Sequence, residues 1–373
     1  MELSFLRPLY ARPGPWASVY LDASRDTADA SSALELRWRA LAEQLGDLGA
    51  EPETVDALDR VVRKHDPQPG EYGLAAFASE GQVVLAEYLS APPRRDLADY
   101  GPLPHTMPLV AQRGEQVAWL RVLANRTGAD LDAVTVGGVP RHAHVRGGES
   151  FPIRRVQPGA WAQSRFQREA MMNWKRNAKD AASVTADLAD QVGAEVIVIA
   201  GDPHARSQLA AQLPERWQDR VVLTDAGSRA AGADLERLDD VTIQVIAGAA
   251  AERTKAVLDR YCQQERVGNG LDAVVQALQR SQVDTMLIVD DPSSTATLWI
   301  GPDPTDIAMS ADDLRSMAVR EPVEVRADSA LIRALAATDA AITLVGPDEV
   351  PLEDGVGAVL RYVDTGTPAT VKA

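Results

Sequence analysis

Strand-like apolar runs alternate with helically spaced apolar residues in the first part of the chain. Between Leu34 and Leu45, apolar side chains recur every three or four positions, which is the spacing of one helix face. Shorter apolar runs bounded by glycine and polar residues are typical of strands. These patterns predict strands at 17–21, 73–78 and 83–86 and helices at 31–46 and 53–64. The proline-rich segment 91–108 then indicates a boundary, which places a first domain at residues 1–112.

The middle of the chain repeats this alternation around a continuous apolar run, which is typical of a strand buried on both faces. The patterns predict strands at 117–123, 131–136, 196–200 and 221–223 and helices at 162–192 and 205–213. A loop with several glycines and arginines, residues 137–161, precedes the longer helix. Together these elements predict a second domain at residues 113–240.

The last part of the chain has the same mixture of patterns and predicts a third domain at residues 241–373. The predicted elements are helices at 249–265, 271–280 and 330–337, strands at 285–289 and 341–345, and a final apolar segment at 355–362. Strands that alternate with helices need both a sheet and a helical layer to bury their apolar faces. The sequence therefore predicts an α/β (α+β) fold of three domains with mixed sheets.

Charge is distributed unevenly along this acidic chain. The formal net charge is −16, yet the window 141–180 holds nine basic residues and three acidic ones. On a helix, the basic residues from Arg165 to Lys179 fall within an arc of about 100°, with Phe166 and Trp174 on the opposite side. A segregated basic face can bind RNA while the acidic remainder limits indiscriminate binding. The alternative is an ordinary solvated helix face.

Aromatic and imidazole side chains accompany the basic residues. Trp161 stands in a loop beside glycine and proline, where an indole can stack on an unpaired base or, alternatively, pack into the domain core. His142 and His144 offer flat rings for the same purpose. As an H-x-H pair they could also ligate zinc, but the neighbouring Arg141 and Arg146 oppose a dication. We therefore expect RNA binding and no metal site.

Familiar enzyme motifs are missing from the sequence. Residues 268–273 read G-N-G-L-D-A, but this pattern follows a predicted helix, whereas a dinucleotide fingerprint follows a strand. Cys262 is the single cysteine, which excludes an intramolecular disulfide. No apolar run approaches the roughly 18 to 20 residues that span a bilayer, and residues 1–15 lack a signal-peptide pattern. We expect a cytoplasmic protein without catalytic residues, cofactor or membrane contact.

Residues 165–168, R-F-Q-R, resemble part of a motif in the archaeal and eukaryotic class-I peptide release factors and their relative Pelota. In that family a Gly-Gly-Gln loop is followed by a helix that begins S-x-x-R-F-x-R. On this pattern Gly159, Ala160 and Trp161 stand where the family has Gly, Gly and Gln, so the hydrolytic glutamine is missing. Residues 277–291 and 355–362 are similar to the family's helix-to-strand segment and to its terminal G-x-G-G-I-L-R-Y.

The chain also lacks the codon-reading Asn-Ile-Lys-Ser motif, and it is similar to the bacterial branch of the family, which includes the ribosome hibernation factor Balon. Its length, acidic balance and Trp-bearing loop resemble the actinobacterial members. The resemblance implies a protein that occupies the ribosomal A site, on 16S and 23S rRNA, and associates with elongation factor Tu. It also places the first domain near the decoding centre and the central loop near the peptidyl-transferase centre. We expect a monomer that binds no DNA and is not an enzyme.

The expected rRNA contacts are the basic, imidazole and loop-tip residues of the central domain. They are Arg141, His142, His144, Arg146, Arg154, Arg155, Gly159, Ala160, Trp161, Arg165, Arg168, Lys175, Arg176 and Lys179. Two alternatives stay open. One is a ribosome rescue factor or peptidyl-tRNA hydrolase of the same architecture, with Gln163 or Gln157 in place of the absent glutamine. The other is a stress-linked protein whose partner is a protein and not RNA.

Overall fold

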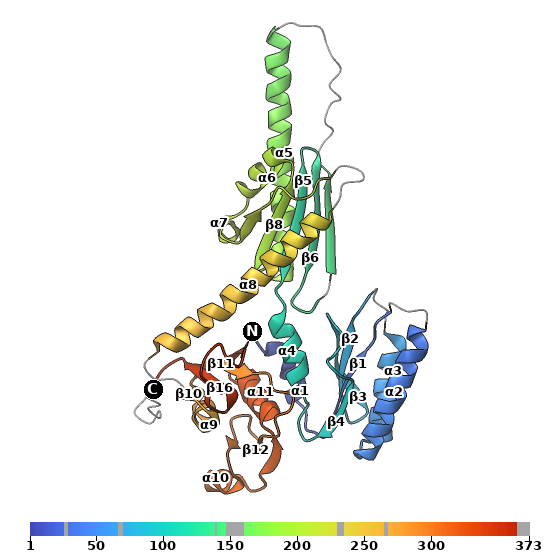
Figure 1. Cartoon of the computed structure of the whole chain (residues 1–373), viewed down its shortest axis with the longest axis vertical. Coiled ribbons are helices and arrows are strands. Elements are labelled where there is room, and N and C mark those ends of the chain that lie inside the picture. Colours follow the sequence, from blue (N-terminus) through green and yellow to red (C-terminus); the bar gives the residue numbers. More distant parts are fainter. Residues whose placement is uncertain are drawn as a thin grey trace. The chain divides into compact units, whose positions relative to one another are not determined.

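The computed structural model describes residues 1–25, 29–65, 70–138, 140–146, 160–229, 235–264 and 268–363, with only the backbone at 115 and 160–175. These residues form two compact units (Figure 1). Unit 1 contains Met1–Glu115 and Arg253–Ala373, and unit 2 contains Gln116–Glu252. Sheets and helices occur in both units, so the predicted mixed α/β class is confirmed. The finer division into three domains stays a prediction.

The N-terminal part of unit 1 is a four-stranded antiparallel sheet in the order β3-β2-β1-β4. Its strands are β1 (Trp16–Asp22), β2 (Gly73–Ser79), β3 (Gln82–Leu89) and β4 (Leu97–Gly101). Side chains alternate between two cores along β1: Val19 and Leu21 join the core beneath the helices α2 (Ala30–Asp47) and α3 (Pro52–Lys64). Tyr20 points into the opposite core. This sheet is therefore covered on both faces.

Strand β4 lies inside the segment 91–108, in which the sequence indicated only a boundary. Prolines flank the strand, and its five residues pair with β1 from Trp16↔Gly101 to Tyr20↔Leu97. An edge strand pairs on one side only and needs few apolar residues. Its sequence pattern is correspondingly weak.

The C-terminal part of unit 1 contains two small sheets and their helices. The larger sheet has the order β10-β16-β11-β15, with β11 parallel to β15 and antiparallel to β16. Its strands are β10 (Gly268–Asn269), β11 (Val283–Val289), β15 (Ala341–Val345) and β16 (Val356–Leu360). The smaller sheet joins β12 (Thr297–Ile300), β13 (Ile307–Ala308) and β14 (Val323–Arg326). The helices are α9 (Leu271–Gln279), α10 (Ala311–Ser316) and α11 (Ala327–Ala337).

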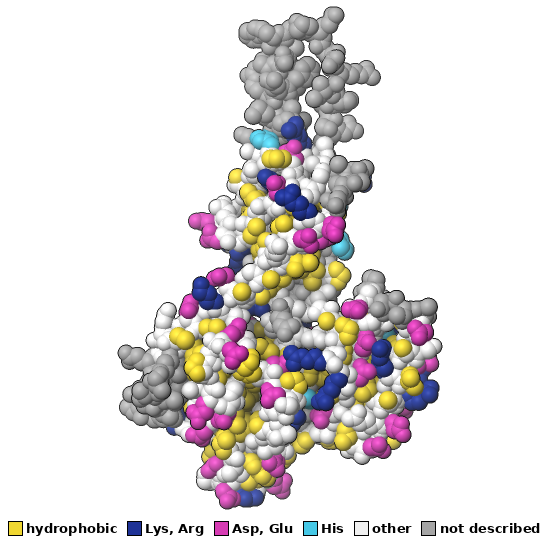
Figure 2. Space-filling model, viewed as in Figure 1, with side chains coloured by type: hydrophobic (Ala, Val, Ile, Leu, Met, Phe, Trp, Pro, Cys, Tyr) yellow, Lys and Arg dark blue, Asp and Glu magenta, His cyan; other side chains and the backbone are white. Residues whose placement is uncertain are grey.

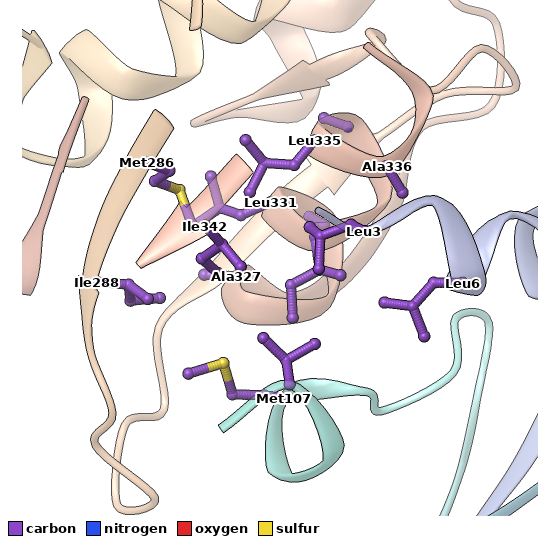
Figure 3. Packing of buried hydrophobic residues seen from close by; sticks show 14 of the residues in the cluster. Leu3, Leu6, Met107, Met286, Ile288, Ala327, Leu331, Leu335, Ala336 and Ile342 are labelled. Atoms are coloured by element: carbon purple, nitrogen blue, oxygen red, sulfur yellow. The ribbon is translucent and has the colours of Figure 1, made fainter. Parts of the chain in front are cut away.

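The two ends of the chain share one hydrophobic core in unit 1 (Figure 3). Leu3 precedes the N-terminal turn η1 (Ser4–Leu6), and Leu6 ends it. Both belong to the same cluster as Leu331 of α11. Met107, at the start of α4 (Met107–Glu115), joins this cluster. The N-terminal amino group also donates a hydrogen bond to the Ile342 carbonyl at 2.7 Å. The N-terminal segment is thus an integral part of the C-terminal core.

A buried polar cluster lies beside this core. The Tyr20 hydroxyl donates to the carbonyl of His105 at 2.8 Å, and His105 Nε2 lies 3.7 Å from a carboxylate oxygen of Asp328. Arg326 forms an ion pair with Asp328 at 2.7 Å. Burial lowers the pKa of His105 because the charged imidazole loses its water, and Asp328 opposes this shift only partly. The imidazole is therefore neutral near pH 7.

Unit 2 is built on a five-stranded sheet in the order β7-β6-β5-β8-β9. The strands are β5 (Trp119–Asn125), β6 (Gly128–Val134), β7 (Pro140–Arg146), β8 (Val196–Gly201) and β9 (Val221–Leu223). The helices are α5 (Ala160–Val192), α6 (Pro203–Ala210), α7 (Glu215–Gln218) and the first part of α8 (Glu236–Gln263). Side chains of α5 and α6 pack on one sheet face, and Leu238 of α8 packs on the other.

The segment 137–161, predicted from the sequence to be a loop, contains strand β7. Val145 is the one buried side chain of the strand, which otherwise presents polar or half-buried residues at the sheet edge. Its pairing with β6 depends on backbone hydrogen bonds, and these leave no apolar signature in the sequence. None of the described helices is both long and apolar enough to cross a membrane.

The shared core predicts that Leu6→Ala destabilises unit 1. Leu6 is fully buried, and truncating such a side chain in a packed core costs about 2 to 5 kcal/mol in the free energy of unfolding. Leu36→Ala is the matched control because Leu36 is 65% exposed on α2, and it should change stability by less than about 0.5 kcal/mol. Urea unfolding followed by circular dichroism measures both. Equal effects of the two substitutions would contradict the shared core.

The lowered pKa of His105 predicts a loss of stability as the pH falls from about 7 to about 5. The unfolded chain takes up the proton first, so the free energy of unfolding decreases below the unfolded pKa of about 6.5. His105→Gln should flatten this part of the profile, which for one proton has a slope of at most about 1.4 kcal/mol per pH unit. His204→Gln, at an exposed position, is the control. An unchanged profile in His105→Gln would rule out this origin.

Candidate nucleic-acid interface

The described side chains of α5 separate into two faces, as the sequence predicted. Ala178 and Ala181 are buried against the sheet, whereas Arg176 and Lys179 are exposed. The helix is fixed to the β5–β6 turn by the side-chain amide of Asn177, which donates to the backbone carbonyl of Arg126 at 3.1 Å. Lysine and arginine side chains lie beside α5 on the face of unit 2 that Figure 2 shows. The exposed Arg176 and Lys179 of α5 therefore lie close to this turn.

Pairing of β7 with β6 brings each histidine opposite an aspartate. Asp130 stands opposite His144, and Asp132 opposite His142. His142 Nδ1 lies 2.8 Å from Asp132 Oδ1, and His144 Nδ1 bonds to Asp130 in the same way. Arg146 Nε donates to His144 Nε2 at 3.2 Å, so the ring accepts there and donates through Nδ1 to the carboxylate. Both nitrogens of His144 thus have protein partners.

Two arginines that sequence reasoning missed complete these pairs. Arg121 on β5 contacts Asp132 at 3.1 Å and also bonds to Asp239 on α8. Arg229 reaches Asp130 at 2.6 Å and donates to the side-chain carbonyl of Asn125 at 2.8 Å. Partial burial on its own would raise the pKa of Asp130, but hydrogen bonds from Arg229 and His144 lower this pKa below its ordinary value. Each carboxylate of β6 is therefore neutralised within the sheet.

A sequence signal for these pairs did exist. Asp130 and Asp132 are two residues apart, as are His142 and His144, and this spacing puts each pair on one sheet face. The arrangement holds each imidazole against an aspartate carboxylate. Among the described residues, no group of three His, Cys, Asp or Glu side chains could hold a metal ion.

The β5–β6 turn adds a further cation that is not among the residues predicted from the sequence. Arg126 is half-exposed there, with its Nε 3.5 Å from Asp202. The turn ends at Gly128, where a Cβ would lie 2.0 Å from the Val145 carbonyl oxygen, so only glycine fits. Gly128 pairs with Arg146 across the strands. Arg146 is thereby held next to the turn.

A cavity of about 20 Å³ lies between this turn, α5 and α6, with Arg126, Asn177 and His204 in its lining. We call the exposed cations around it the α5-base patch. Its members are Arg126, Arg176 and Lys179. Arg146 is not a member, because it alternates with Val145 and lies with His144 on the sheet face opposite to α5. The members come from the β5–β6 turn and from α5, so the patch exists only in the folded unit.

The remaining predicted contacts divide into two groups. Arg141 is exposed on β7 but alternates with His142, so it lies on the opposite sheet face from the histidines. The other group falls outside the described side chains: Arg154, Arg155, Gly159, Ala160, Trp161, Arg165, Arg168 and Lys175. For Ala160 and the residues after it the backbone belongs to α5, which begins two residues before the predicted 162–192 helix. Their roles stay predictions.

Comparisons with known proteins give relatives for the whole chain. Residues 118–266 match the family model of bacterial archaeo-eukaryotic release factor family 2. The uncharacterized protein Rv2629 of Mycobacterium tuberculosis strain H37Rv is 31% identical, with 98% of each chain covered. The uncharacterized protein MT2704 of strain CDC 1551 matches equally well.

Several solved structures are also similar at low identity. The archaeal translation termination factor aRF1 is 16% identical over 96% of both chains, with a TM-score of 0.25. Archaeoglobus fulgidus Pelota is 14% identical over 79% of this chain and 80% of its own, with a TM-score of 0.31. Saccharomyces cerevisiae Dom34 is 9% identical over 79% of this chain and 82% of its own, with a TM-score of 0.38. With a relative matched over nearly its whole length and a family model matched across unit 2, this chain belongs to the bacterial archaeo-eukaryotic release factors.

Proposed function

We propose that this protein is a ribosome hibernation factor that binds rRNA in the A site of idle ribosomes without releasing peptide. The observation that carries the proposal is the α5-base patch. Its cations are exposed on a chain with a net charge of −16, at the base of the helix that resembles the catalytic-loop helix of release factors. Membership of a release-factor family supplies the partner class, which is the ribosome.

The electrostatics of unit 2 favour an RNA partner for this patch. The carboxylates of Asp130 and Asp132, which would otherwise repel phosphates, are occupied by histidine and arginine side chains. Exposed arginine and lysine then act on phosphate groups directly, and release of counterions from the RNA adds to the affinity. The acidic remainder of the chain opposes binding to RNA in other orientations. This segregation supports a single docking direction.

Trp161 distinguishes hibernation from peptide release. The resemblance places it where release factors have the glutamine that positions the hydrolytic water. A glutamine amide both donates and accepts hydrogen bonds, whereas an indole has one N–H donor and no acceptor. Trp161 can stack on rRNA bases in the peptidyl-transferase centre and block it, but it cannot orient a water molecule in the same way. Association with elongation factor Tu belongs to the same proposal, on the resemblance alone.

Neutralising the patch should weaken ribosome binding. Arg176→Gln combined with Lys179→Gln is expected to lower cosedimentation with ribosomes and to reduce the slope of log K against log salt by roughly 0.7 to 0.9 for each phosphate that the protein no longer neutralises. Arg216→Gln with Arg237→Gln removes the same charge from exposed positions of unit 2 and should leave binding unchanged. Equal cosedimentation of both double variants would exclude the patch from the interface.

The missing glutamine predicts that the purified protein releases no peptide from ribosomal complexes that carry labelled peptidyl-tRNA. Hydrolysis should equal that of a protein-free sample, for the native chain and for Gln163→Ala alike. A general catalyst must hold its group to within about 0.5 Å, which a glutamine two residues further along the chain, in α5, does not achieve. Peptide release that disappears in Gln163→Ala would establish the alternative, a ribosome rescue factor or peptidyl-tRNA hydrolase.

A further inference from the structure

An open groove of about 640 Å³ lies in unit 1 between α3 and the β2–β3 hairpin. Its apolar base includes Ala57, Val61 and Leu74. Polar and aromatic side chains border it, from Arg60, Lys64 and His65 on the helix side and Glu87 and Tyr88 on β3. This groove belongs to a different unit from the α5-base patch and shares no residue with it.

Two exposed cations give the groove a positive rim. Arg60 and Lys64 are one helical turn apart, and neither forms an ion pair within the described part of the chain. Arg63, which lies between them in sequence, is instead bound to Asp59 at 2.8 Å. Arg63 is therefore held in an ion pair, whereas Arg60 and Lys64 are exposed cations that form no ion pair with the described residues.

The acidic lining residue does not cancel this charge. Glu87 forms an ion pair with Arg113 at 3.0 Å, and both side chains are less than one-fifth exposed. Burial raises the pKa of Glu87, which Arg113 opposes. The negative charge of Glu87 is thus balanced by Arg113 within the groove wall. The rim therefore keeps the positive charge of Arg60 and Lys64.

Aromatic rings form the wall next to these cations. His65 Nδ1 donates to the Val62 carbonyl at 2.6 Å, and its Nε2 lies 3.1 Å from the Tyr72 hydroxyl. Its ring is 6.4 Å from that of Tyr88, which in turn is 6.0 Å from that of Tyr72. Rings fixed in this manner lose little conformational freedom when a planar ligand stacks on them. Tyr88 is half-buried and lines the groove.

We propose that this groove binds a nucleoside phosphate, with the phosphate at Arg60 and Lys64 and the base stacked on Tyr88. Cations beside fixed aromatic rings match the two parts of that ligand, its anionic phosphate and its planar base. An acidic peptide would use the cations and leave the rings without a partner. The ligand is either a free nucleotide or an unpaired nucleotide in an RNA strand, and both present the same chemistry.

Binding of labelled ATP and labelled hexauridylate to the full-length protein, measured by fluorescence anisotropy without ribosomes, tests the proposal. Arg60→Gln with Lys64→Gln should weaken binding about tenfold or more, since charge-assisted hydrogen bonds are removed. The control is Arg63→Gln, which removes a charge from the same helix and should keep native affinity. Binding of both probes identifies a nucleotide site, and binding of hexauridylate alone identifies an RNA strand.

Tyr88→Leu tests the stacking part separately. It should weaken binding about fivefold or more while leaving the salt dependence unchanged, because stacking involves no ion release. A hexauridylate that carries 4-thiouridine should crosslink to the peptide containing Tyr88. No binding of either probe, an equal loss in Arg63→Gln, or a crosslink only in unit 2 would overturn the proposal.

The inference does not depend on the proposed function. The variant with Arg176→Gln and Lys179→Gln should keep its affinity for the groove probes while its cosedimentation with ribosomes decreases. If instead ribosome binding persists and groove binding fails, the groove proposal falls and the proposed function stands. Thermal unfolding of every variant checks that the exposed substitutions leave unit 1 folded.

Discussion

The pairing register of β6 and β7 is the constraint on which the candidate interface depends. It sets Asp130 against His144 and Asp132 against His142, and it holds Arg146 opposite Gly128. A slip of β7 by one residue would move Val145 to the polar face and turn His142 and His144 toward the α5 side, away from the aspartates. Gly128 protects against such a slip because its backbone approaches Val145 too closely for any side chain. A single tight turn thereby fixes the charge pattern of the whole sheet edge.

That register also explains how an acidic protein keeps a basic surface. The carboxylates of Asp130 and Asp132 are engaged by Arg121 and Arg229 as well as by the histidines, so they contribute little negative potential outside the sheet. Partly buried ion pairs of this kind contribute modestly to stability, since desolvation offsets much of the attraction. Their effect on the surface potential is larger. It leaves the exposed cations of α5 and the turn to face a polyanion.

Unit 1 depends on a different interaction, the core that the two ends of the chain build together. Leu3 and Leu6 fill space against α11, and α11 in turn is buried along most of its length. A helix with so little exposed surface needs partners on several sides, and the N-terminal residues supply one of them. The groove beside α3 therefore sits on a sheet whose far face is held by the C-terminal core. Its walls have a rigid support, which favours a binding role.

The sequence by itself determined the elements whose pattern is local. The helix faces of α2 and α5 and the buried strands β1, β2 and β8 follow from apolar spacing, because burial on a core imposes a period on consecutive residues. Only the tertiary structure decided the rest. Strands β4 and β7 lie at sheet edges, where backbone pairing requires no apolar pattern. The aspartate–histidine pairs, the α5-base patch with Arg126, and the groove with Arg60 and Tyr88 join residues far apart in sequence. Their proximity comes from register and packing, which no local period encodes.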